Sequence, residues 1–514
     1  MSLLAAVAGL ATMARLTQVP YPIVLVIGGL ALGAVPGISE PELPHDLVLV
    51  IFLPPLLYSA AFFANLHDLR RDVRPISLLA VGLVLATMCT VAVVAHELID
   101  GMPWAVAFVL GAIVAPTDPL AAATIARRMA VPRRVVSIIE GESLVNDGTA
   151  LVAYNVARTA VAVGAFSLWD AGLDFARAAA GGVAIGLAVG WVISEIRRRL
   201  DDVPVEIVIS LVSGYAAYLP AEKAHVSGVL AAVTTGIVLG WRAPQISTAR
   251  MRLQGYAVWE TLVFLLNALL FVLIGLQLPR ILGDLGGQPP VELAGHAAAV
   301  CLAVILTRLV WVHALVYVIR GLDRRPQQAE RRASWPVRTI IGWSGMRGAV
   351  SLAAGLALPP TFPYRNLVLF LTFCVIFATL VLQGLTLPAL IRRLRVRDDG
   401  ADEREELLGR RAATEAALRR LDELGNEEWT RDDTAARMRG IYEYRRRRLA
   451  ARAGESEAGD RYEHRSLAYQ RMVRSVLDAQ RDELVALRNR GEISNEVMHR
   501  LERELDLEDE RLEI

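Results

Sequence analysis

The densest group of polar residues in the apolar part of the chain is the run EGESLVNDGTALVAYN, within a helical window over residues 135–163. On a 3.6-residue period, Ser143 and Asp147 share one face of a helix. Glu142 and Asn146 have the same spacing, on a face rotated by about 100°. Hydroxyl and carboxylate oxygens are ligands that hard cations such as Na⁺ and Li⁺ prefer. The spacing favours a cation site over the alternative, a set of polar groups that only bond neighbouring helices.

A second acidic residue extends this face toward one end of the helix. Glu140 lies seven residues before Asp147, about 10 Å nearer the cytoplasm, where we expect it to line a funnel. Ionisable groups within membrane spans cost several kcal/mol unless they line a pathway or pair. Burial disfavours the charged form of a carboxyl group, and a bound cation opposes protonation. A site that holds H⁺ or Na⁺, but not both, predicts antiport if it opens alternately to each side.

The chain around these residues divides into two unlike parts. Of its 514 residues, 54% are hydrophobic and 21% are charged, but the long apolar runs lie in residues 1–394, and residues 395–514 are dense in Arg, Glu and Asp. This division excludes a simple globular enzyme and predicts an all-α polytopic membrane domain followed by a helical soluble domain. The net charge of +1 averages the two parts and indicates no nucleic-acid partner.

The apolar runs supply thirteen windows near the length of about 20 residues that a bilayer core requires. They span residues 2–18, 21–36, 46–65, 75–96, 104–126, 135–163, 171–196, 204–219, 225–241, 255–279, 292–319, 336–358 and 364–392. Arginines cluster after the third window and after every second window from there on, for example at Arg70, Arg71 and Arg74. Because cytoplasmic loops are enriched in Arg and Lys, the N-terminus is expected outside and the C-terminus in the cytoplasm.

The fifth window is interrupted by the run APTDP at residues 115–119. Pro119 removes a backbone donor, and Pro116 disfavours a helical conformation at the residue before it. Asp followed by Pro is also a common start of a helix, with Asp118 as the N-cap. We therefore expect this helix to stop and restart at mid-depth, which is tolerable only where the unwound backbone lines a cavity or packs in protein.

A second interruption is expected in the twelfth window, where glycines surround Arg347 at positions Gly342, Gly345 and Gly348. The two windows are seven apart, so they cross the membrane in opposite directions. Matched interruptions in oppositely oriented helices are typical of an inverted repeat and mark its binding site. If the helices cross, Asp118 compensates the positive N-terminal ends and Arg347 the negative C-terminal ends. The alternative is an ordinary proline kink and a glycine packing groove.

Four ordered runs resemble the sodium/proton exchangers of the cation/proton antiporter superfamily. They are GAIVAPTDPLAA, EGESLVNDGTA, WETLVFLLNALLFVLIGLQLP and GWSGMRGAVSLAAGLALP, and the resemblance covers roughly residues 20–395. The pair Asn146-Asp147 is similar to the electroneutral branch. The resemblance implies a homodimer in the plasma membrane with a rocking or elevator motion.

The resemblance also implies roles for individual residues. It assigns the Na⁺ site to Asp147, Asp118, Ser143 and the backbone carbonyl of Thr117. Asp147 would alternately bind the cation and a proton. Asn146 would replace a second acid and bond to Thr117 or nearby backbone. Glu142 and Arg347 would form a buried ion pair between the sixth and twelfth helices.

Four further positions are weaker candidates. Many relatives carry a carboxylate where the run LPPLLYSAAFF has Ser59, so an acidic contact to the ion is absent or supplied elsewhere. Glu206 and Glu260 match polar positions of the family and are expected to form structural pairs, with Arg308 as a partner for either. Histidine is the side chain that most often changes charge near physiological pH, so His225 is a candidate pH sensor, although an anchor at the membrane interface is the preferred interpretation.

The sequence thus predicts a non-enzymatic antiporter of pH homeostasis that exchanges Na⁺ or Li⁺ for H⁺ without a cofactor. If Glu142 is neutralised and Asn146 cannot titrate, one exchangeable charge favours one-for-one exchange. A K⁺/H⁺ antiporter on the same fold is the nearest alternative, followed by a cation channel and a transport-inactive sensor. Residues 395–514 form either a regulatory or dimer-contact domain or a solvated stalk.

Overall fold

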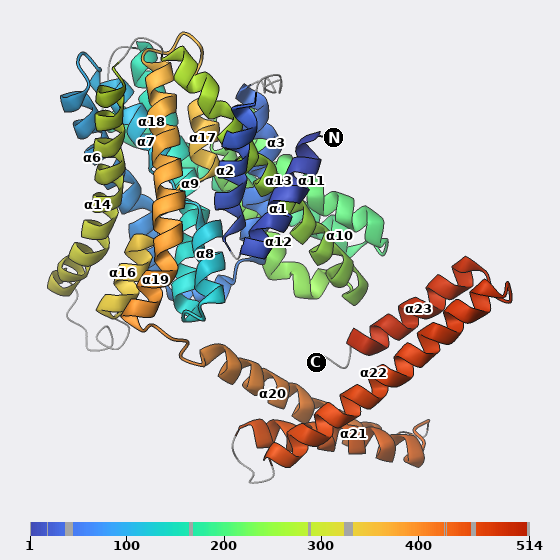
Figure 1. Ribbon diagram of the computed structural model, residues 1–514. Coiled ribbons are helices and arrows are strands. Elements are labelled where there is room, and N and C mark those ends of the chain that lie inside the picture. Colours follow the sequence, from blue (N-terminus) through green and yellow to red (C-terminus); the bar gives the residue numbers. More distant parts are fainter. Residues whose placement is uncertain are drawn as a thin grey trace. The chain divides into compact units, whose positions relative to one another are not determined.

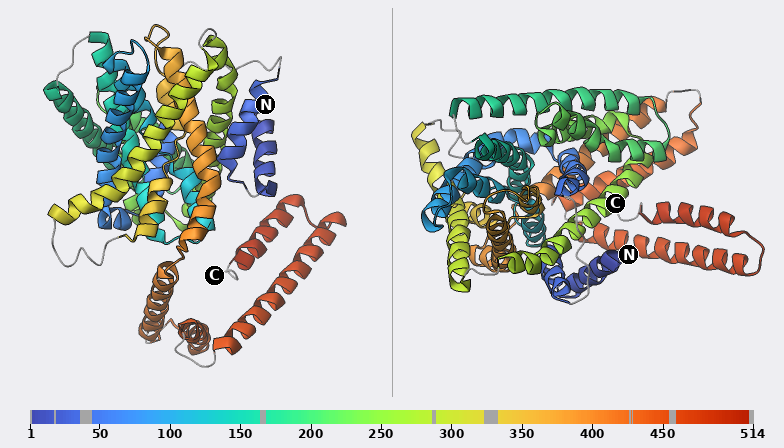
Figure 2. Two further views of the ribbon diagram at one scale, coloured as in Figure 1. Left: turned by 60° about the vertical axis from the view of Figure 1, so that its left-hand side comes forward. Right: turned by 90° about the horizontal axis from the view of Figure 1, so that it is seen from above.

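The computed structural model describes residues 2–17, 19–35, 45–163, 168–285, 289–322, 333–425, 427, 429–453 and 459–510. The chain divides into two compact units, Met1–Asp399 and Gly400–Ile514. Figures 1 and 2 show that both are built from helices. Each unit is described by itself below.

The first unit contains the predicted membrane-spanning helices. Eight stretches of its described residues are long and apolar enough to cross a bilayer: Val73–Leu98, Trp104–Arg128, Gly172–Arg198, Val203–Lys223, Gly228–Ile246, Ala249–Gly283, Pro290–Ala314 and Arg365–Leu394. Three shorter apolar helices are Leu3–Thr17, Tyr21–Gly33 and Val50–Phe63. The remaining two windows hold the more polar helix Arg133–Val163 and the broken pair Trp335–Trp343 and Ala349–Leu356. Every one of the thirteen predicted windows holds a helix or a broken pair, and the all-α membrane fold is confirmed.

The helices of this unit, in chain order, have the following bounds. They are α1 (Ser2–Thr17), α2 (Tyr21–Gly33), α3 (His45–Phe63), α4 (Leu66–Arg71), α5 (Val73–Ser77), η1 (Leu78–Leu83), α6 (Val84–Leu98), α7 (Trp104–Val114), α8 (Pro119–Arg128), α9 (Arg133–Val163), α10 (Leu168–Arg198), α11 (Val203–Lys223), α12 (Gly228–Ile246), α13 (Ala249–Asp284), α14 (Pro290–Leu322), α16 (Trp335–Trp343), α17 (Ala349–Leu356), α18 (Arg365–Ala378), η2 (Thr379–Gln383) and α19 (Gly384–Leu394). The stretches η1 and η2 are π-helical insertions within longer helices.

Both predicted interruptions are present. The first separates α7 from α8, where Asp118 has an extended backbone (φ −93°, ψ 121°) and accepts a hydrogen bond from the backbone N–H of Leu120 at 2.8 Å. The second separates α16 from α17, which begins after an extended Gly348. The backbone N–H of Asp118 donates to the carbonyl of Met346 at 2.8 Å, so the two breaks touch. This contact places unwound backbone against unwound backbone inside the unit.

Small residues let several of these helices approach closely. A Cβ atom on Gly236 would lie 2.6 Å from the carbonyl oxygen of Tyr58, and one on Gly240 would lie 2.3 Å from that of Phe62. Such close backbone approaches are typical of packing between membrane helices. They seat α12 against α3, and in Figure 1 α14 and α18 similarly lie side by side.

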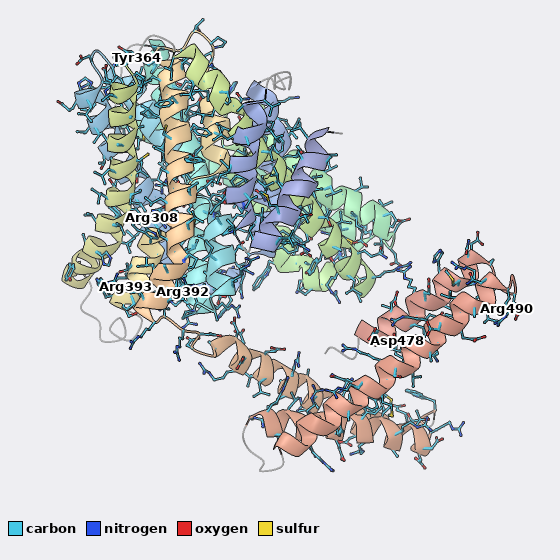
Figure 3. All side chains as sticks on the ribbon, in the orientation of Figure 1. Arg308, Tyr364, Arg392, Arg393, Asp478 and Arg490 are labelled. Atoms are coloured by element: carbon cyan, nitrogen blue, oxygen red, sulfur yellow. The ribbon has the colours of Figure 1, made fainter. Side chains whose placement is uncertain are left out.

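The described residues of the second unit form four helices: α20 (Ala401–Leu424), α21 (Asp432–Arg452), α22 (Gly459–Asn489) and α23 (Asn495–Glu510). Partly exposed ion pairs link its helices, for example Arg481 of α22 with Asp506 and Asp509 of α23. Figure 3 labels Asp478 and Arg490 at the surface of this unit, whereas Arg308 lies within the helices of the first.

Candidate ion-binding site

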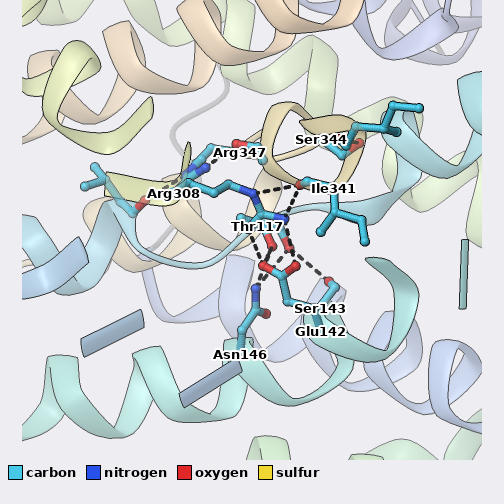
Figure 4. Close-up of polar contacts among 11 residues, drawn as sticks. Thr117, Glu142, Ser143, Asn146, Arg308, Ile341, Ser344 and Arg347 are labelled. Atoms are coloured by element: carbon cyan, nitrogen blue, oxygen red, sulfur yellow. Dashed lines mark hydrogen bonds and ion pairs between the residues drawn. The ribbon is translucent and has the colours of Figure 1, made fainter. Parts of the chain in front are cut away.

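The first break is tied to α9 through Thr117. The Ser143 hydroxyl donates to the backbone carbonyl of Thr117 at 2.9 Å, and the Asn146 amide donates to the Thr117 hydroxyl at 2.7 Å. That hydroxyl in turn donates to Oε1 of Glu142 at 3.0 Å. Figure 4 shows these four side chains converging on one point. The predicted hydrogen bond of Asn146 with Thr117 is confirmed, and the structure adds the one from Ser143.

Two carboxylates lie beside this network with few partners of their own. Asp147 is on α9, four residues after Ser143, and is 6% exposed. Among the described residues it receives no hydrogen bond. Asp118 is partly exposed, and within the described part of the chain its side chain accepts one hydrogen bond, from the backbone N–H of Leu120. Asp118 directly follows Thr117, whose carbonyl accepts the bond from Ser143, and Asp147 lies one helical turn after Ser143, so both acids flank the same contact. Their oxygens, with the hydroxyl and carbonyl above, are the ligand types that a hard monovalent cation requires.

The expected pair between Glu142 and Arg347 is wrong. Both carboxylate oxygens of Glu142 are held by Arg308 of α14, Oε1 through a short contact with Nη1 and Oε2 at 2.7 Å from Nη2. Glu142 and Arg308 are each 1% exposed. Arg308 also donates to the carbonyl of Ile341, near the end of α16, at 3.2 and 3.1 Å. A planar guanidinium suits such bidentate recognition, and the physical reason for the error is that Arg347 is directed elsewhere.

Arg347 stabilises the end of the other broken helix. Its Nε donates to the carbonyl of Val114, the last residue of α7, at 3.0 Å, and Nη1 contacts the carbonyl of Gly345. The predicted compensation of a helix C-terminus by Arg347 is therefore confirmed. Its backbone N–H donates to the hydroxyl of Thr379 at 3.0 Å. Thr379 opens η2, and such insertions often occur at functional sites. Sequence reasoning missed Thr379, because nothing in its apolar run indicates a π-helix.

The four helix ends at the crossing are thus compensated by charge. Asp118 caps α8, and a Cβ atom on Gly348, the N-cap of α17, would lie only 2.0 Å from Oδ2 of Asp118. Arg347 faces the carbonyl end of α7 and Arg308 that of α16. Negative charge near N-terminal ends and positive charge near C-terminal ends is the favourable arrangement. The sequence predicted Asp118 for both N-terminal ends and Arg347 for the C-terminal ends, but Arg308 at the end of α16 was not predicted.

A sequence model described as "Sodium/hydrogen exchanger, transmembrane" matches residues 2–393. The chain belongs to this family. An uncharacterized Na⁺/H⁺ exchanger of Mycobacterium tuberculosis is 36% identical over 507 residues, covering 96% of this chain and 92% of the relative. The Na⁺/H⁺ antiporter ApNhaP of Aphanothece halophytica is 32% identical, covering 80% and 78%. The exchanger is therefore an integral membrane transporter.

The fold of the exchanger matches that of a solved structure. The sodium proton antiporter MjNhaP1 of Methanocaldococcus jannaschii aligns with a TM-score of 0.59 at 21% identity, covering 76% of this chain and 97% of that one. At this identity the likeness concerns the fold alone.

Two of the remaining predicted residues of the exchanger lie apart from the breaks. Glu140, on α9, forms an ion pair with Arg127, and their side chains are 42% and 65% exposed. This position lies in the first turns of α9. Ser59 is buried on α3 and donates to the carbonyl of Leu56 at 2.9 Å. Its hydroxyl therefore bonds within α3 and makes no contact with the ion site among the described residues.

The other weak candidates are outside the site as well. Glu206 is fully buried and pairs with Arg197 at 3.6 Å. Glu260 is exposed on α13, and no ion pair of it is present in the described part of the chain. The expectation that Arg308 pairs with either of them is wrong, because Glu142 occupies its guanidinium. His225 is exposed in the turn between α11 and α12, with a left-handed backbone (φ 55°).

Proposed function

We propose that this exchanger moves one Na⁺ (or Li⁺) in exchange for one H⁺, with Asp147 binding the two ions alternately. The observation that carries the proposal is the Asp147 carboxylate, which is buried, lacks a hydrogen-bond donor among the described residues and lies one helical turn from Ser143, the residue that contacts the first break. A desolvated carboxylate must be neutralised by a proton or a cation. Either ion excludes the other, which is the requirement for coupled exchange.

The charges around Asp147 support one-for-one exchange. Glu142 and Arg308 neutralise each other, and Asn146 cannot titrate. Arg347 and Asp118 both lie at the crossing, and the proposal requires that they keep their opposite charges throughout the cycle. Asp147 is then the single group whose occupancy changes, so each cycle would carry one cation one way and one proton the other.

The cation would bind at the crossing of the two breaks, between Asp147, Asp118, Ser143 and Thr117. The Ser143 hydroxyl and the Thr117 carbonyl already lie 2.9 Å apart and supply neutral oxygens. We further propose a plasma-membrane homodimer with its N-terminus outside and the second unit in the cytoplasm, which the arginine-rich loops and the positive-inside rule support. Glu140 would then lie on the cytoplasmic side of the site.

Internal pH of proteoliposomes under an imposed Na⁺ gradient tests the mechanism, with and without a potential clamp by valinomycin and K⁺. We expect Na⁺-dependent proton movement that ignores the clamp and disappears in Asp147→Asn. Glu260→Gln is the matched control, since it removes an exposed carboxylate from another membrane helix and should leave exchange intact. Exchange that persists in Asp147→Asn would refute the role of Asp147, and a response to voltage would refute the one-for-one stoichiometry.

K⁺/H⁺ exchange at the same site is a second candidate. A relative in Bacillus subtilis, 30% identical over 94% of this chain and 73% of its own, is named a sodium, potassium, lithium and rubidium/H⁺ antiporter. Repeating the measurement with a K⁺ gradient in the absence of valinomycin distinguishes the two. Proton movement driven by K⁺ but not by Na⁺ would decide for this alternative.

A further inference from the structure

A cavity of about 370 Å³ lies where the chain turns from α3 into α4, facing the second half of α12. Most of its lining is apolar, including Ala64 and Leu69 on one side and Ile237 on the other. The exposed His67 and the Gln245 side chain add polar groups. None of these residues belongs to the ion site, so the cavity needs a separate explanation.

The opening of this cavity carries positive charge. Trp241, which lines it, is 59% exposed, and the guanidinium carbon of Arg70 lies 5.2 Å from the centre of the Trp241 ring. A cation over an aromatic face is held in place by the ring. The neighbouring acids do not neutralise Arg70, because Asp68 pairs with Arg133 and Asp72 with Arg134. Arg70 is therefore positioned and available to an anion.

The cavity lies at one end of the apolar helices. Arg242, directly after Trp241, donates to the Ser194 hydroxyl near the end of α10 at 3.0 Å. The C-terminal parts of α3, α10 and α12 thus meet on one face, where Trp and Arg follow long apolar runs. Trp and Arg concentrate where a membrane span meets water. This arrangement places an apolar cavity and a cationic opening at the depth of lipid headgroups.

We propose that this cavity binds an anionic phospholipid of the cytoplasmic leaflet, with its phosphate at Arg70 and His67 and its glycerol and upper chains against Leu69 and Ile237. A soluble anion would leave the apolar lining exposed to water, whereas a lipid fills it. The inference rests on the orientation proposed above. Helix α4 packs on α9, and the cavity lies between α4 and α12. A bound lipid would therefore bridge α4 and α12.

Lipid retained by the purified full-length exchanger after detergent exchange tests this site. The protein is incubated with phosphatidylglycerol or phosphatidylcholine, and bound lipid is counted by mass spectrometry. We expect selective retention of phosphatidylglycerol, reduced about fivefold in Arg70→Ala, as for one arginine near an anionic surface. Arg71→Ala removes another exposed arginine of α4 and is the matched control. Ala64→Leu should lower retention by filling the cavity without changing charge.

Three results would overturn the proposal. Equal retention in Arg70→Ala, Ala64→Leu and the control would mean ordinary surface lipid. Equal retention of phosphatidylcholine would mean that the headgroup charge is not recognised. Displacement of the lipid by millimolar inorganic phosphate would point to a soluble anion. Because bound lipid is counted without any ion gradient, these outcomes are independent of whether Asp147 exchanges Na⁺ for H⁺.

Discussion

The two broken helices are interrupted at corresponding places but are held by different means. At the break between α7 and α8, the residues of the break itself start the second helix: Pro119 is the first residue of α8, and Asp118 caps it through the N–H of Leu120. The break between α16 and α17 has no side-chain cap at Gly348. Its ends are held from other helices, by Arg308 at Ile341 and by Thr379 at the N–H of Arg347.

This difference indicates which break depends on the rest of the fold. A proline and an N-cap act within one turn, so the start of α8 is set locally. The second break depends on α14 and η2, and through Arg308 it also depends on Glu142 of α9. The first break joins the same group, because Thr117 donates to Glu142. The Glu142–Arg308 pair therefore contacts both breaks, the first through Thr117 and the second through Ile341.

Breaking the Glu142–Arg308 pair should lower the stability of the exchanger more than any other change proposed below. Glu142→Gln leaves Arg308 buried without a counter-charge, and losing one partner of a buried pair costs about 3–5 kcal/mol. We expect a corresponding loss of thermal stability in detergent. Glu140→Gln is the matched control, since it removes a carboxylate from the same helix but from an exposed pair, where the cost is about 0–1 kcal/mol.

A double variant separates the cost of an unpaired buried charge from the cost of the other contacts that Glu142 and Arg308 make. In Glu142→Gln with Arg308→Gln no buried charge is left unpaired, so part of the lost stability should return. Equal destabilisation by Glu142→Gln and Glu140→Gln would show that the breaks do not share this support.

Placing a larger residue where the two breaks touch should reduce stability and transport to an intermediate degree. A Cβ atom in Gly348→Ala would lie 2.0 Å from Oδ2 and 2.6 Å from Cβ of Asp118. Overpacking of this kind typically costs about 1–3 kcal/mol, and a displacement near 1 Å at a working site can reduce a rate about a hundredfold. Na⁺-dependent proton flux measures the outcome. In Gly342→Ala the nearest atom is the end of a leucine side chain at 3.1 Å, so that variant should stay active. Equal fluxes in both variants would contradict the close contact at Asp118.

The same difference explains what the sequence could predict. Apolar runs, prolines and glycines act locally, and they predicted the helices and both interruptions. Four-residue spacing predicted that Ser143 and Asp147 share one face of a helix, and the family resemblance predicted the bond of Asn146 with Thr117. The partner of Glu142 lies 166 residues away on α14, and its identity depends on how helices are rotated and which are neighbours. Local patterns contain neither fact, so Arg308 was assigned to the wrong acids and Thr379 was missed.

The smallest effect on stability is expected at Asp118, where capping and charge can be separated. Asn is as good an N-cap as Asp, so Asp118→Asn should change the free energy of unfolding by less than about 0.5 kcal/mol, whereas Asp118→Ala should cost about 1 kcal/mol. Asn lacks the negative charge, however, and supplies only one carbonyl oxygen to a cation.

If Asp118 contributes charge to the ion site, Asp118→Asn will fold normally but require more Na⁺ for half-maximal exchange. The Na⁺ dependence of proton flux, measured beside thermal unfolding of the same preparation, separates the two roles. Unchanged Na⁺ dependence in Asp118→Asn, with weakened stability only in Asp118→Ala, would restrict Asp118 to capping. The first break would then be purely structural, and Asp147 would be the only acid of the pair that meets the cation.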